Sequence, residues 1–71
     1  MNDSRRMVAV APDDASFMRL FYAVRAEATM QKRVDSRSAE FSVPGDRMTW
    51  FLGHCERYRI TCHEVRAGGT L

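Results

Sequence analysis

The sequence is short of cysteine and of long apolar runs, and both shortages narrow the possibilities. Cys55 and Cys62 are the only cysteines among its 71 residues, so one disulfide at most can form. The longest apolar runs are far shorter than the about 18 residues of a transmembrane helix, and the polar start Met1–Arg6 does not resemble a signal peptide. We therefore expect a cytoplasmic protein without a membrane segment, in which both thiols are reduced.

The sequence also lacks an excess of charge of either sign. The net charge is only +2, and the eleven basic residues, all but one of them arginine, are interleaved with nine acidic ones. A nucleic-acid-binding domain gathers its basic residues on one face. The pattern favours a mixed-charge surface and no nucleic-acid partner.

Apolar residues make up 45% of the chain, which is enough for one small core. A domain of this size buries only about 60% of its unfolded surface, so its stability is marginal without a staple or a partner.

The pattern predicts a frayed, disordered terminus over residues 1–5 and a buried strand over about 6–11, ended by Pro12. Asp13 and Asp14 then mark a helix start, which we expect to extend over about 14–33. Its apolar face repeats at helical spacing and consists of Phe17, Leu20, Phe21, Val24 and Ala28.

A polar loop is expected at Asp35–Glu40, followed by a second helix over about 43–57. Phe41 would act as its hydrophobic staple and Ser42 as its N-cap. Gly53 lies inside this helix and costs it up to ~1 kcal/mol relative to alanine. The expected apolar face consists of Met48, Phe51, Leu52, Cys55 and Tyr58.

The alternation after this helix predicts a strand over about 58–66, and Gly68-Gly69 predicts a tight hairpin turn beyond it. The fold class is therefore α/β (α+β). We expect one incomplete domain over 6–71, a β-α-α-β unit with the start of an antiparallel hairpin. Few residues remain after this turn to form the second strand of the hairpin. We therefore expect either the front part of a larger domain or a small protein that a partner completes.

The histidine and cysteine pairs His54-Cys55 and Cys62-His63 raise the question of a metal site. Strand alternation sends Cys62 and His63 to opposite faces, and zinc ligands usually come in pairs at shorter spacings. Cys55 falls on the apolar helix face, which is typical of an inert buried thiol. We predict core cysteines and surface histidines, with no metal ligand and no catalytic residue in this chain.

Several segments together resemble the N-terminal region of GCN5-related N-acetyltransferases. The segments are Met7–Phe17, Val24-Arg25-Ala26-Glu27, Phe41-Ser42-Val43-Pro44, Trp50-Phe51 and the expected hairpin at 62–71. The resemblance implies an acceptor-side wall formed by Arg25 and Trp50, and an amine-bearing acceptor substrate. That family binds acetyl-CoA through a later glycine-rich loop that this chain lacks. The resemblance therefore implies a segment that binds no cofactor and is inactive alone, and that would use acetyl-CoA only when completed by a C-terminal half.

The alternative is a small interaction or inhibitor protein that stands alone. It would dimerise, or bind a protein partner, through an open sheet edge and its helix faces.

Overall fold

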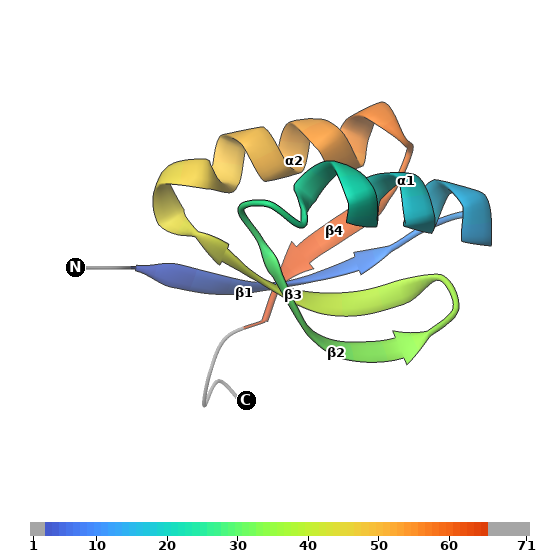
Figure 1. Cartoon of the computed structure of the whole chain (residues 1–71), viewed down its shortest axis with the longest axis horizontal. Coiled ribbons are helices and arrows are strands. Elements are labelled where there is room, and N and C mark those ends of the chain that lie inside the picture. Colours follow the sequence, from blue (N-terminus) through green and yellow to red (C-terminus); the bar gives the residue numbers. More distant parts are fainter. Residues whose placement is uncertain (1–2, 66–71) are drawn as a thin grey trace.

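The computed structural model describes residues 3–65, which form a four-stranded antiparallel sheet and two α-helices (Figure 1). The elements, in chain order, are β1 (Ser4–Val10), α1 (Asp14–Val24), β2 (Thr29–Asp35), β3 (Ser38–Pro44), the short 3-10 helix η1 (Gly45–Arg47), α2 (Met48–Arg57) and β4 (Thr61–Glu64). The predicted α+β class is confirmed. Within residues 3–65, neither helix is long and apolar enough to cross a bilayer.

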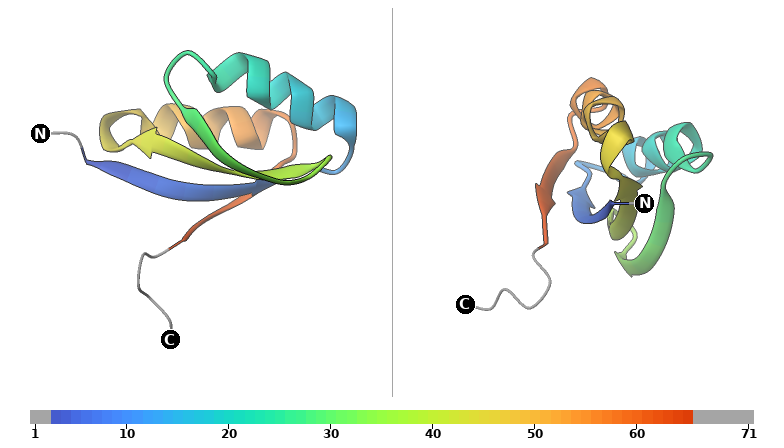
Figure 2. Two further views of the ribbon diagram at one scale, coloured as in Figure 1. Left: turned by 60° about the horizontal axis from the view of Figure 1, so that its bottom comes forward. Right: turned by 90° about the vertical axis from the view of Figure 1, so that its left-hand side faces the viewer.

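The strands lie side by side in the order β2-β3-β1-β4, and every neighbouring pair is antiparallel. Because β1 and β2 both run against β3, they are parallel to each other with β3 between them. This order of elements is the split β-α-β, or ferredoxin-like, arrangement. It leaves β2 and β4 as the two edges of the sheet (Figure 2).

Both helices cover the same face of the sheet, and the hydrophobic core lies between the two layers (Figure 1). Side chains alternate along each strand, so Ala39, Phe41 and Val43 of β3 face the helices, whereas the intervening residues face away. Phe41 is central because its ring lies 5.5 Å from that of Phe51 and 6.4 Å from that of Phe17. The buried apolar residues are Met7, Ala9, Ala11, Phe17, Leu20, Val24, Ala28, Ala39, Phe41, Val43, Phe51, Cys55 and Ile60.

The first helix begins as predicted but ends early. The Asp13 carboxylate accepts the backbone N–H of Ser16 at 2.7 Å, a side-chain N-cap. The helix stops at Val24, so the predicted extension to residue 33 is wrong. The reason is tertiary: residues 29–35 form β2, whose backbone pairs with β3 instead of continuing the helical ladder.

The predicted order strand, helix, helix, strand omitted two strands. The segment read as a loop at Asp35–Glu40 is the turn and start of the β2–β3 hairpin. Phe41 and Ser42 are strand residues, not a staple and an N-cap, and α2 begins at Met48, not near residue 43. Pairing with β1 on one side and β2 on the other fixes this segment as a central strand.

Two further boundaries differ from the prediction. Ser4 and Arg5 are ordered in β1 because they pair with the end of β3, and the Gly45 N–H donates to the Asp3 carbonyl at 2.8 Å. β4 begins at Thr61, because residues 58–60 close the end of α2 through hydrogen bonds to its last carbonyls. The expected turn at Gly68-Gly69 lies outside the described residues.

Asp35 organises the β2–β3 turn. Its carboxylate accepts the backbone N–H of Arg37 at 2.8 Å and the hydroxyl of Ser38 at 2.9 Å. Both hydrogen bonds stabilise the ionised carboxylate, and the one from the Arg37 N–H has the larger effect. Together they hold the pKa of Asp35 below its ordinary value.

A depressed carboxylate pKa predicts acid sensitivity of the fold. The folded-state pKa of Asp35 lies below the unfolded value of 3.8, so its stabilisation is complete above that value and is lost as the pH falls through the folded-state pKa. We expect Asp35→Ala to lose less stability than the wild type between about pH 5 and pH 3, measured by urea unfolding. Asp46→Ala, at an exposed position of η1, is the matched control for the removal of one carboxylate; equal acid profiles for Asp35→Ala and the wild type would contradict the prediction.

Candidate functional site

The outer edge of β4 presents backbone groups that no described residue satisfies. The Val65 N–H donates to the Arg6 carbonyl at 2.8 Å, so Arg6 and Val65 form a hydrogen-bonded pair of the β1–β4 ladder. Such pairs alternate along antiparallel strands, which turns the peptide groups of Cys62 and Glu64 away from β1. Within residues 3–65, no strand lies on the side of β4 to which these groups point.

The opposite edge of the sheet is protected. β2 carries two register irregularities, one between Met30 and Lys32 and one between Arg33 and Asp35, which interrupt its backbone spacing. Its side chains are mostly exposed and include two adjacent cations, Lys32 and Arg33. Bulges and edge charges are devices that oppose strand addition, so of the two edges formed by residues 3–65 it is β4 that is open to pairing.

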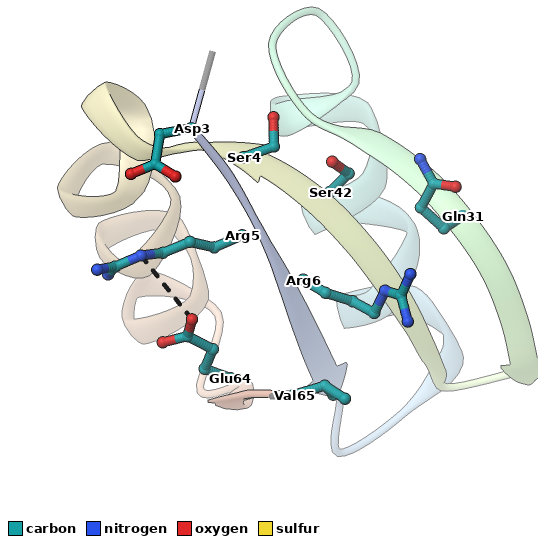
Figure 3. A pocket seen from close by; sticks show the side chains of 8 residues that line it. All are labelled: Asp3, Ser4, Arg5, Arg6, Gln31, Ser42, Glu64 and Val65. Carbon is teal, nitrogen blue, oxygen red and sulfur yellow. Dashed lines mark ion pairs between the residues drawn. The ribbon is translucent and has the colours of Figure 1, made fainter. Parts of the chain in front are cut away.

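An open depression of about 570 Å³ lies beside the first residues of β1, where β4 as described ends (Figure 3). It is lined by Asp3, Ser4, Arg5, Arg6, Gln31, Ser42, Glu64 and Val65. Both of its arginines have an acidic neighbour: the Nε atom of Arg5 lies 3.8 Å from Oε2 of Glu64, and the Nε atom of Arg6 lies 3.6 Å from Oε1 of Glu40. Solvent-exposed ion pairs of this kind are typical of a polar contact surface.

A second, shallower depression of about 430 Å³ lies between α2 and β4 and contains both cysteines. Cys55 is buried at the end of α2, and Cys62 is half-buried on the core-facing side of β4, opposite Ala9. Hydrogen bonding from the Cys55 S–H to the Cys62 thiolate lowers the pKa of Cys62. The same hydrogen bonding raises the pKa of Cys55, and the burial of that thiol raises it further.

The histidines do not join the cysteines in a metal site. His63 pairs with Val8 and lies on the opposite face of β4 from Cys62. His54 instead packs against Trp50, with ring centroids 5.2 Å apart, and stacks on Tyr58. Its buried Nδ1 atom has no hydrogen-bond partner among the described residues. Within residues 3–65, no group of three histidine, cysteine or acidic side chains is placed to hold a metal ion.

The two residues assigned to an acceptor wall have separate surroundings. Arg25 caps the end of α1 and lies over the Tyr22 ring at 5.0 Å, whereas Trp50 contacts His54 on α2. Neither lines the two depressions described above. Their role in binding an acceptor stays a prediction.

The helix-free face of the sheet has few features of a nucleic-acid surface. Proteins that bind single strands on a sheet present aromatic rings for base stacking. The described strand residues on this face include no phenylalanine, tyrosine or tryptophan, and its arginine, Arg6, is paired with Glu40. Sequence reasoning expected an open sheet edge, but it did not identify Cys62 and Glu64 as the residues with outward peptide groups, because these depend on strand pairing and not on any local motif.

Comparisons of this chain with protein-family models, curated proteins and solved structures found no match. The fold and the exposed edge therefore carry the functional argument alone.

Proposed function

We propose that this chain is a protein-interaction module that pairs with a second copy of itself, edge to edge, through β4. The observation that carries the proposal is the row of outward peptide groups at Cys62 and Glu64, on the sheet edge that no other part of residues 3–65 covers with a strand. A second copy completes those hydrogen bonds and extends the sheet from four strands to eight.

The β4 edge is self-complementary. In an antiparallel pair of β4 strands related by a two-fold axis, Cys62 of each copy faces Glu64 of the other, and both residues supply outward peptide groups. The adjoining flank of α2 carries Leu52, which is 41% exposed and would be covered by the second copy. The depression beside this edge is lined by Glu56 of α2 and by Arg59 of the turn that follows it, one charge of each sign that can attract the opposite charge on a second copy.

The acetyltransferase resemblance has less support. It implies two successive helices after the first strand, and here β2 and β3 lie between the helices. An activity with acetyl-CoA and an amine acceptor stays a prediction for a longer protein.

A backbone-directed substitution tests the edge. Glu64→Pro removes the outward N–H, and Glu64→Ala removes the same side chain but keeps the N–H. The N–H occurs twice in the symmetric pair, so we expect Glu64→Pro to weaken self-association by about tenfold or more, and Glu64→Ala by about twofold or less.

Sedimentation equilibrium over a concentration series gives the association constants, and circular dichroism checks that each variant is folded. A wild-type chain that stays monomeric up to about 1 mM, a concentration at which even weak pairing is seen, would sink the proposal. Equal association by the proline and alanine variants would also contradict it.

A further inference from the structure

We propose that Cys55 and Cys62 form a thiol–disulfide exchange site that closes to an intramolecular disulfide when it meets a small-molecule disulfide. The inference rests on the placement of the two thiols and on the depression that opens onto them, and it does not depend on edge pairing.

The chain brings the two sulfurs together through a tight connection. Cys55 lies in the last turn of α2 and Cys62 is the second residue of β4. The Ile60 N–H donates to the Cys55 carbonyl at 2.8 Å, and Arg59 has a positive φ of 61°, which turns the chain sharply back. Both cysteines line the same depression, which places them together beside this turn, and a disulfide between them needs a sulfur–sulfur bond of about 2.05 Å.

The depression gives the two thiols different roles. It is open to solvent, and Cys62 is half-buried, whereas Cys55 is only 2% exposed. A reagent therefore reaches Cys62 first, and the hydrogen bond from Cys55 favours the thiolate there. Arg59 and Glu56 both line the depression, so the lining does not repel a zwitterionic disulfide such as oxidised glutathione.

The exchange proceeds in two balanced steps. The Cys62 thiolate attacks one sulfur of the small disulfide, forms a mixed disulfide and releases one thiolate, which takes a proton from water. Cys55 then loses its proton to solvent, and its thiolate attacks the Cys62 sulfur and releases the second small thiol. The protein dithiol loses two electrons and two protons, and the small disulfide is reduced to two thiols.

The test uses the full chain, treated with oxidised glutathione in oxygen-free buffer and followed by mass spectrometry and thiol titration. The wild type should become lighter by two hydrogen atoms and lose both thiols without gaining a glutathionyl group. Cys55→Ser should stop at the mixed disulfide on Cys62, because the resolving thiol is missing. Cys62→Ser should react at least about tenfold more slowly than Cys55→Ser, because only the buried thiol is left.

Three results would overturn the assignment. The wild type could keep both thiols at equilibrium with excess oxidised glutathione, or it could form only disulfides between two chains. The two serine variants could also react at the same rate, with circular dichroism showing both folded, which would remove the distinct roles of Cys62 and Cys55.

Discussion

Phe41→Ala is expected to lower the free energy of unfolding by about 3–5 kcal/mol. The Phe41 side chain is fully buried, and its ring bridges Phe17 of α1 and Phe51 of α2 at centroid distances of 6.4 and 5.5 Å. Truncation to alanine removes the contact that joins both helices to the central strand and leaves a cavity between the two layers. Small domains are stable by only about 0.05–0.15 kcal/mol per residue, or about 4–11 kcal/mol for 71 residues, so a loss of this size removes a large part of the stability.

Urea unfolding followed by circular dichroism measures this loss, and two further variants make it interpretable. Phe41→Leu keeps most of the buried volume and should cost about 1–2 kcal/mol, which leaves a measurable transition if Phe41→Ala is unfolded in water. Tyr22→Ala removes an aromatic ring that is 59% exposed on α1 and should change stability by about 0.5 kcal/mol or less. If Phe41→Ala cost no more than Tyr22→Ala, the central position of Phe41 in the core would be wrong.

The elements that sequence reasoning found are those whose signals are local. The aspartate N-cap and the spacing of Phe17, Leu20 and Val24 define α1 without any information about its neighbours, and all three residues are buried as expected. The core face of α2 was likewise visible at Phe51 and Cys55. Caps and helical periodicity arise within one element, so the sequence carries them directly.

The two missed strands failed for different reasons. β2 is an edge strand whose side chains are mostly exposed, and its two irregularities break the alternation that would have marked it. Gln31, Lys32 and Arg33 also favour helices, which made an extension of α1 look reasonable. In β3 the alternation of Ala39, Phe41 and Val43 was present, but the Ser42-Val43-Pro44 segment also matched a helix start.

The candidate sites could not have been predicted from spacing. The placement of Cys55 and Cys62 beside one depression depends on the turn with positive φ at Arg59, a conformation that the residue type does not predict. The open edge at β4 depends on the strand order, which is set by pairing between segments more than 50 residues apart in the chain, as between Met7 and Glu64. Both features belong to tertiary structure.

Gly45→Ala is expected to destabilise the protein by about 1–3 kcal/mol. A Cβ atom at this position would lie 2.9 Å from the backbone carbonyl oxygen of Asp3, closer than real Cβ contacts. That oxygen also accepts the Gly45 N–H at 2.8 Å, so the clash and the hydrogen bond involve the same group. Relief of the clash has to move the start of β1 away from the end of β3, because backbone, unlike a long side chain, cannot turn aside.

Gly53→Ala provides a control with the opposite sign. Gly53 lies inside α2, and a Cβ atom there would meet nothing within 4 Å, so alanine adds helix propensity without a clash. We expect this variant to gain up to about 1 kcal/mol, which raises the melting temperature by about 4–8 °C for a domain of this size. Thermal melts of both variants at one concentration measure the difference. Equal melting temperatures, or a stabilised Gly45→Ala, would show that the close approach of β1 to η1 does not constrain the fold.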